Sequence, residues 1–211
     1  MSKLTRRALG AVGFGAAGIA VILATSASFA QQPPPVRVRG EITKVDGNTL
    51  AVKARDGANL TVKLAEPPRI AAMEKASLDD IKEGTFVGVS AMPQADGSQK
   101  AFAIHIFMDS QKGVVADRFL PWDSRPGSTM TNAFVANQVT GKDGRELLVK
   151  YKDGEKKVIV PPETVIAKYA PGSAADLKVG AKVFVAAAKK EADGSLVAPN
   201  IAVGRTIDPP Q

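Results

Sequence analysis

The sequence predicts an all-β protein built from two small barrels in tandem, and two observations carry this prediction. The stretch from Asp46 to Gly57 (DGNTLAVKARDG) is matched by the stretch from Asp143 to Gly154 (DGRELLVKYKDG), and each has two Asp-Gly turns around an alternating apolar run. A further Asp-Gly follows each copy, at Asp96 and at Asp193. All three turns recur at a spacing of 97 residues, which is the signature of an internal duplication.

Each repeat is predicted to contain five strands. In residues 36–107, apolar positions alternate with polar ones in five runs, as expected of strands with one buried face. These positions are Val36 and Val38, Leu50 and Val52, Leu60 and Val62, Val87 and Val89, and Ile104 and Ile106. Asp-Gly suits the turns between them because both residues tolerate the positive φ of a tight hairpin.

A short helical turn is predicted between the third and fourth strands of each repeat. In residues 77–84 (SLDDIKEG), Ser77 is the expected N-cap and Gly84 the expected stop, and residues 173–180 (SAADLKVG) repeat the pattern. Five strands with one such turn form the layout of a small OB-like barrel. We therefore expect two OB-like barrels, residues 36–107 and residues 133–206. One larger sandwich that shares strands between the halves is the alternative.

Residues 108–132, between the repeats, are expected to be an irregular but packed segment. They show little periodicity yet contain Phe119, Leu120 and the single tryptophan of the chain, Trp122. A connection of this length is typically functional or disordered, and a free linker would not carry these large apolar side chains. Residues 31–35 (QQPPP) read as a stiff spacer and residues 207–211 as a tail.

The first thirty residues have the features of a signal peptide. Lys3, Arg6 and Arg7 precede an apolar run, and Ser28-Phe29-Ala30 has small residues where a signal peptidase cleaves. The adjacent arginines fit a twin-arginine signal as well as a general secretory one, and an uncleaved membrane anchor is a third interpretation. The mature protein is expected in the periplasm or outside the cell, beginning at Gln31.

Composition excludes some functions and weakens others. There is no cysteine, which excludes disulfides and thiolate chemistry. Loss of the three positive charges of the signal lowers the net charge from +7 to +4, which is weak for a nucleic-acid-binding protein. No catalytic triad, nucleotide-binding glycine loop or metalloprotease motif stands out. We expect no cofactor, no nucleic-acid partner and no enzymatic activity.

The inter-repeat segment supplies the first candidate ligand site. Trp122, Asp123, Arg125, Ser128 and Thr131 combine an aromatic face with charged and hydroxyl groups. OB barrels commonly bind ligands on one face flanked by loops, so these residues could line a cleft. A hydrophobic plug with a polar rim is the other interpretation of the same cluster.

Two further sets of candidates are weaker. Lys150 and Lys152 lie in a lysine-rich hairpin that could meet an anionic polymer or lipid headgroups, although such runs are usually solvated strand faces. His105 is the single histidine, and its alternation with isoleucines predicts a solvent-facing side chain. With Met108 and Met130 it could instead bind Cu(I) or Ag(I), since imidazole and thioether groups suit soft metals.

The repeat pattern resembles a bacterial family of exported proteins with a repeated domain of unknown function. The resemblance rests on the paired Asp-Gly turns, on Leu177-Lys178-Val179-Gly180 and its first copy Ile81-Lys82-Glu83-Gly84, and on the Pro121-Trp122-Asp123 segment. Some members are labelled metal ABC transporter permeases, but the mature chain has no apolar span of membrane length. A weaker similarity is to small periplasmic copper chaperones, although no candidate ligand here sits at their motif positions.

These observations predict a non-catalytic, exported binding or accessory protein for an unknown envelope component or small ligand. A periplasmic Cu(I)- or Ag(I)-handling protein is the main alternative, and an envelope-polymer hydrolase is a third. A membrane-surface association would follow if the signal segment were retained. The sequence leaves the oligomeric state open.

Overall fold

The computed structural model describes residues 34–141 and 144–209, and these form an all-β structure. The predicted signal peptide, most of the proline-rich spacer and the turn at residues 142–143 lie outside the described residues. The strands of the first repeat are β1 (Val36–Asp46), β2 (Thr49–Ala54), β3 (Asn59–Leu64), β4 (Ile70–Lys75), β5 (Phe86–Pro93) and β6 (Gln99–Ile106). Those that follow are β7 (Arg118–Pro121), β8 (Thr129–Gly141), β9 (Gly144–Tyr151), β10 (Gly154–Val160), β11 (Val165–Pro171), β12 (Lys182–Lys190), β13 (Leu196–Ala198) and β14 (Ile201–Gly204).

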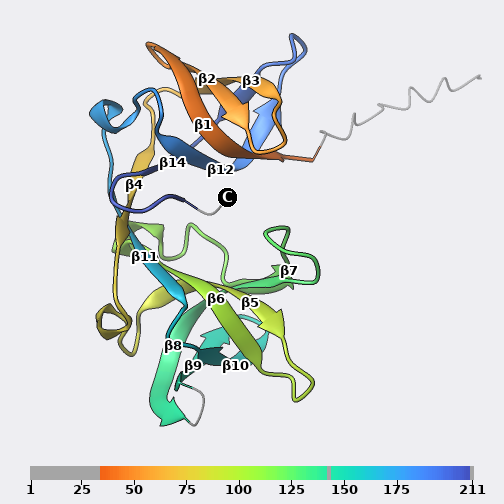
Figure 1. Cartoon of the computed structure of the whole chain (residues 1–211), viewed down its shortest axis with the longest axis vertical. Helices are drawn as coiled ribbons and strands as arrows, with labels where there is room; N and C mark the ends of the chain where they lie inside the picture. Colours follow the sequence, from red (N-terminus) through yellow and green to blue (C-terminus); the bar gives the residue numbers. More distant parts are fainter. Residues whose placement is uncertain (1–33, 142–143, 210–211) are drawn as a thin grey trace, which may run out of the picture. The chain divides into compact units, whose positions relative to one another are not determined.

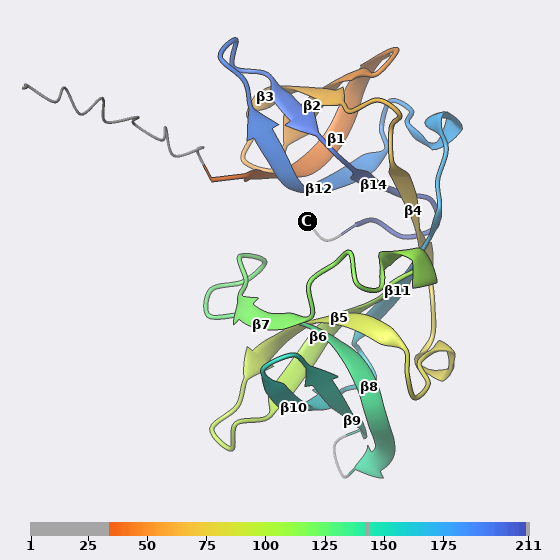
Figure 2. The same ribbon diagram turned by 180° about the vertical axis from the view of Figure 1, so that it is seen from behind.

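The strand pairing closes on itself in two places (Figures 1 and 2). One closed five-stranded barrel runs β1-β2-β3-β13-β12 and back to β1, with β3 and β13 parallel. We call it the β1 barrel. The other circuit, the β8 barrel, runs β8-β9-β10-β6-β5 and back to β8, with β10 and β6 parallel. Closure removes the exposed edges that short strands would otherwise present.

Neither barrel is made from one contiguous repeat, which differs from the predicted tandem arrangement. The β1 barrel takes its last two strands from the second repeat, and the β8 barrel takes β5 and β6 from the first. Residues 36–107 and 133–206 therefore exchange strands. The alternative prediction, one sandwich with strands shared between the halves, was right that strands are shared. It was wrong about the sandwich, because the strands close into barrels. The physical reason is the duplication itself, because Val87 and Val89 are buried in one barrel as Val183 and Val185 are in the other.

Two crossover strands carry the chain between the barrels. β4 and β11 pair antiparallel with each other, while β4 pairs parallel with β14 and β11 pairs parallel with β6. This continuous run of hydrogen-bonded strands joins one barrel wall to the other. A third apolar cluster lies here, containing Met73, Ala167, Phe184 and Ala202, with Tyr169 packed against it.

The predicted helical turns are present as single 3₁₀ turns, η1 (Leu78–Asp80) and η3 (Ala174–Asp176). Gly84 and Gly180 follow them at φ 78° and 88°. Their N–H groups donate to the carbonyls of Val135 and Ile42, both at 2.8 Å. The two glycines thus make the same contact in the two barrels, as the duplication predicts.

The segment expected to be irregular, residues 108–132, is more ordered than predicted. It contains a 3₁₀ turn, η2 (Asp109–Gln111), and β7, and β8 begins inside it at Thr129. β7 pairs antiparallel with residues 129–132 of β8, opposite the edge that β5 occupies. The segment is therefore anchored to the β8 barrel. Its loop from Trp122 to Ser128 extends toward the β1 barrel, whose residues it contacts.

Candidate functional site

The loop that carries Trp122 and Asp123 is closed by its own hydrogen bonds. The N–H of Trp122 donates to the carbonyl of Ser128 at 2.8 Å, and the N–H of Ser128 donates to the carbonyl of Arg125 at 3.0 Å. The Ser128 hydroxyl lies 2.7 Å from the Arg125 carbonyl and 3.1 Å from the Trp122 carbonyl. Because β7 and β8 hold both ends of this loop, the backbone that carries the Trp122 and Asp123 side chains is fixed in position.

The β1 barrel contributes two arginines to the same place. Arg37 and Arg39 alternate with Val38, whose side chain is buried in the barrel core, so both arginines point outward. Arg39 lies directly opposite Phe184 of β12 in the antiparallel register. A cross-strand pair of this kind places the guanidinium beside the aromatic ring.

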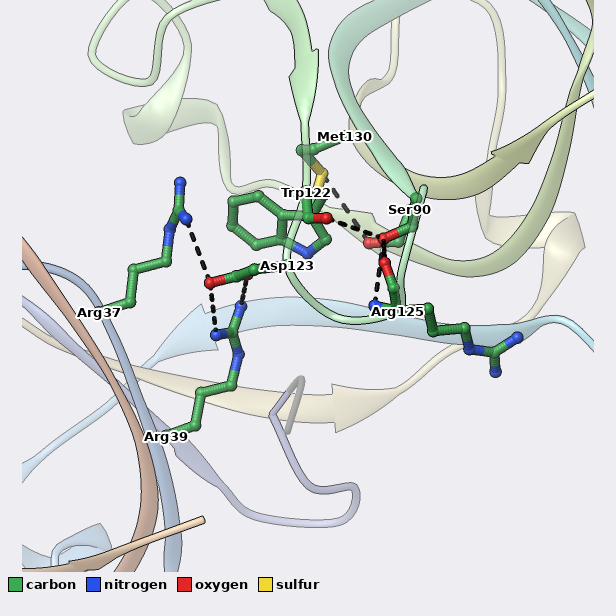
Figure 3. A network of polar contacts seen from close by, with 8 residues as sticks. Arg37, Arg39, Ser90, Trp122, Asp123, Arg125 and Met130 are labelled. Carbon is green, nitrogen blue, oxygen red and sulfur yellow. Dashed lines mark hydrogen bonds and ion pairs between the residues drawn. The ribbon is translucent and has the colours of Figure 1, made fainter. Parts of the chain in front are cut away.

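Asp123 receives both guanidinium groups (Figure 3). Arg39 makes a forked contact, with Nη2 at 2.6 Å from Oδ1 and Nη1 at 3.2 Å from Oδ2. Arg37 Nη1 lies 3.2 Å from the same Oδ2. The forked arrangement of planar guanidinium and planar carboxylate is the strongest form of this ion pair.

Aromatic rings flank the cations. The guanidinium carbon of Arg37 lies 4.4 Å from the centre of the Trp122 ring, and that of Arg39 lies 5.4 Å from it and 5.1 Å from the Phe184 ring. Trp122 and Phe184 meet edge to face at 6.4 Å. We call Arg37, Arg39, Trp122, Asp123 and Phe184 the junction cluster, since its members come from both barrels.

Within the junction cluster, the positive charges outnumber the negative ones, and the N–H donors outnumber the acceptors that they reach. The hydrogen bond from Arg39 holds the pKa of Asp123 below its ordinary value, with a further contribution from Arg37, so one carboxylate faces two cations. Arg39 Nε and Trp122 Nε1 are both buried, and within the described residues neither has a hydrogen-bond partner. Such a donor costs free energy unless a water or a ligand oxygen accepts from it.

The structure brings together only part of the predicted cleft. Trp122 is half-buried at the junction, and Asp123 lies beside it. Arg125 instead stacks on Phe102 of the β8 barrel at 4.0 Å, and Ser128 is a buried residue that closes the loop. Thr131 is fully buried opposite Val89, a core residue of the β8 barrel. Assigning Thr131 to a cleft was wrong, because its position in β8 turns it into the barrel.

Lys150 and Lys152 do not join the junction cluster. Both are exposed, Lys150 on β9 opposite Glu155 and Lys152 in the turn that follows. Neither is in hydrogen-bond or ion-pair contact with the cluster in the described part of the chain. Both side chains are exposed, as in the solvated alternative that the sequence left open.

The predicted solvent exposure of His105 was wrong. Only 6% of the residue is exposed, and its ring lies 6.4 Å from that of Tyr169. The Tyr169 ring, on which Phe107 stacks, covers this part of the outer face of β6. Burial lowers the pKa of His105 to about 4, so the imidazole is neutral near pH 7.

The methionines proposed as soft-metal ligands lie elsewhere. His105 on β6 is opposite Gly88, whereas Met130 on β8 is opposite Ser90, so β5 separates them. Met130 contacts Ser90, with Sδ 4.0 Å from Oγ. Met108 precedes η2, where its N–H donates to Gln111. Among the described residues, no three His, Asp or Glu side chains form a metal-binding group.

A concavity lies beside the β8 barrel, and none of its lining residues belongs to the junction cluster. Its volume is about 520 Å³, and Leu78, Arg145, Pro161 and Ile166 are among its lining residues. Two of its polar side chains have partners within the chain: Arg145 is paired with Asp79 at 2.9 Å, and the Thr164 hydroxyl donates to the Ala101 carbonyl. Its size makes this pocket a candidate ligand site. The buried donors without partners make the junction cluster the better candidate.

No protein-family model matches this chain, and no match was found among characterised proteins or among solved structures. The resemblance to the exported repeat family thus stays a prediction. Within residues 34–141 and 144–209, no helix is long and apolar enough to cross a membrane.

Sequence reasoning missed three members of the junction cluster. Arg37 and Arg39 alternate with Val38, but no local signal links Arg39 to Asp123, 84 residues away. Phe184 was missed because it lies between two valines of a core strand, where only its register with Arg39 reveals its role.

Proposed function

We propose that this protein is a non-catalytic binding protein, with two OB-like barrels as a frame and the junction cluster as its ligand site. The OB-like classification is part of this proposal. It is supported by five-stranded closure and by the 3₁₀ turn that precedes β12 in the β1 barrel and β5 in the β8 barrel. Binding between the barrels agrees with the preference of ligand sites for places where two structural units meet.

One observation carries the proposal: two buried N–H donors in contacting side chains, Arg39 Nε and Trp122 Nε1, have no partner among the described residues. Leaving a buried donor unsatisfied costs about 1–3 kcal/mol. Aromatic faces and fixed cations surround these donors, which is a common composition of binding sites. A ligand that supplies oxygen acceptors would stabilise this arrangement.

Access to the cluster comes from its outer members. The Asp123 side chain is 47% exposed and that of Arg37 is 35% exposed, whereas the Arg39 side chain is 7% exposed. A ligand would therefore approach past Asp123 and Arg37 and reach the buried guanidinium and indole. The buried groups are held in place by the β1–β12 pairing and by the hydrogen bonds that close the loop.

A titration with four classes of small molecule tests this function. Fluorescence of Trp122, the only tryptophan, is followed while neutral sugars, amino acids, carboxylates and phosphates are added to the full chain. We expect at least one class to give a saturable change that Arg39→Met abolishes and that the exposed control Lys150→Met retains. If no class binds, or if binding survives Arg39→Met in a folded variant, the junction cluster is not the ligand site.

A further inference from the structure

The junction cluster already contains a bound carboxylate, that of Asp123. Both of its oxygens are engaged by Arg39, at 2.6 and 3.2 Å, and one of them also by Arg37. The guanidinium of Arg39 is thus oriented to hold a planar carboxylate in a forked pair. This geometry distinguishes a carboxylate from a neutral oxygen acceptor, which would satisfy the donors but not the charge.

The two partners of this ion pair differ in how firmly they are fixed. Arg39 is on β1, which pairs with β2 and β12 on its two sides. Its side chain is 7% exposed, and its guanidinium lies near both Trp122 and Phe184. Asp123 is on a loop, and its side chain is 47% exposed. Solvent screens the charge of an exposed carboxylate, so its ion pair adds little to stability. Asp123 is therefore the partner that can leave.

The balance of charge also favours an incoming anion. Two guanidinium groups share one carboxylate, and Arg39 retains an unpartnered Nε among the described residues. The groups that flank the cations are the rings of Trp122 and Phe184. An anion with an apolar or aromatic body would bury that body against these rings.

We propose that the ligand is a small carboxylic acid with an apolar body, whose carboxylate displaces that of Asp123 from Arg39. This inference rests on the proposed binding function and names the ligand class of the same site. Asp123 acts as an internal competitor: it holds the arginines in a binding-ready orientation and lowers the affinity for weak anions. Inorganic phosphate shares the charge but lacks the planar fork and the apolar body.

Calorimetric titration of the full chain with benzoate, benzamide and inorganic phosphate tests the inference. Benzoate and benzamide have the same shape, so a difference between them reports recognition of the carboxylate. We expect benzoate to bind more tightly than either of the other probes. Asp123→Asn should raise the affinity for benzoate about tenfold, because the competing charge is gone, and Arg39→Met should abolish binding.

Asp79→Asn is the matched control, because Asp79 also pairs with an arginine, Arg145 at 2.9 Å, outside the junction cluster. It removes one negative charge from the chain and should leave the affinity unchanged. If Arg39→Met does not fold, Arg37→Met, on the more exposed arginine, should weaken benzoate binding instead. A purely structural Asp123–Arg39 pair predicts that Asp123→Asn lowers stability without any gain in affinity, and that result overturns the inference.

The outcomes separate this inference from the function on which it rests. One outcome is that a neutral compound binds, that Arg39→Met abolishes this binding, and that benzoate binds neither the wild type nor Asp123→Asn. This outcome would support the site but reject a carboxylic acid as its ligand. Equal binding of benzoate and benzamide, or tighter binding of inorganic phosphate, would reject it as well. Absence of binding by every class would reject both proposals.

Discussion

Met73 of β4 lies directly opposite Tyr169 of β11 in the antiparallel pair that carries the chain between the barrels. Met73 is fully buried, and its carbonyl accepts hydrogen bonds from the N–H groups of Arg205 and Thr206 at 3.0 and 3.3 Å. The Tyr169 ring stacks on Phe107 at 5.4 Å, and burial raises the pKa of its hydroxyl to about 12. The crossover is therefore a packed part of the fold and fixes the barrels that present the junction cluster.

Stability should fall as the pH is lowered from about 6.5 to about 4, because of His105. Burial depresses its folded-state pKa from 6.5 to about 4, so in this window the unfolded chain binds a proton that the folded chain does not. The loss reaches about 3 kcal/mol at the acid end. Urea unfolding of the wild type and of His105→Gln at several pH values measures it, and parallel pH dependence of the two proteins would contradict it.

Thr131→Val should stabilise the protein by about 1 kcal/mol. The Thr131 hydroxyl is fully buried and has no partner in the described part of the chain, so an isosteric methyl group removes a desolvation cost. Thr129→Val is the matched control on the same strand. The Thr129 hydroxyl lies 2.7 Å from Gln99 Oε1, and its loss should destabilise. Unfolding midpoints that move in the same direction for both variants would refute the assignment.

Gly84→Val and Gly180→Val should each cost more than about 1 kcal/mol. Both glycines have positive φ, at 78° and 88°, and a Cβ at either would meet nothing within 4 Å. The penalty is therefore conformational, since β-branched residues are poorly accommodated at positive φ. Asn tolerates this region, so Gly84→Asn and Gly180→Asn should cost clearly less. Equal losses for Val and Asn in thermal unfolding would point to another cause.

Trp122→Ala should cost about 2 kcal/mol, less than the about 3–5 kcal/mol that is typical of a fully buried tryptophan. The side chain is half-buried, and it contacts the two arginines and packs against the apolar cluster that contains Phe184. Acrylamide should quench its fluorescence only in part. Trp122→Phe keeps an aromatic face for the arginines and should retain most of the stability. Complete quenching, with no change in unfolding midpoint for Trp122→Ala, would show a solvated side chain.

The local features of the fold could be predicted, because they depend on local chemistry. Alternating valines predicted most of the strands but not the crossover strands β4 and β11, and Gly84 and Gly180 were predicted to end the helical turns. The strand exchange could not be predicted, because duplicated strands such as those of Val89 and Val185 bury the same residue types in either barrel. The alternation of apolar and polar residues is the same whether a strand pairs within its own repeat or crosses over to the other barrel.

The sequence singled out two residues of the junction cluster and missed the other three, for related reasons. Trp122 and Asp123 stood out because a long apolar segment needs a packing partner. Their partners Arg37 and Arg39 depend on pairings between distant parts of the chain, which local pattern does not contain. His105 was placed in solvent because alternation shows which face a residue is on but not whether distant side chains, here that of Tyr169, cover that face.

Cleavage of the chain between the repeats tests the central claim most directly, that each barrel contains strands of both repeats. A protease recognition sequence inserted between Gly113 and Val114, where Val114 is 73% exposed, allows the folded protein to be cut into one piece with β1–β6 and another with β7–β14. We predict that the pieces co-elute in size-exclusion chromatography at the mass of the intact chain and separate only in denaturant. Pieces that separate without denaturant, each retaining its β-sheet circular dichroism, would contradict the exchange.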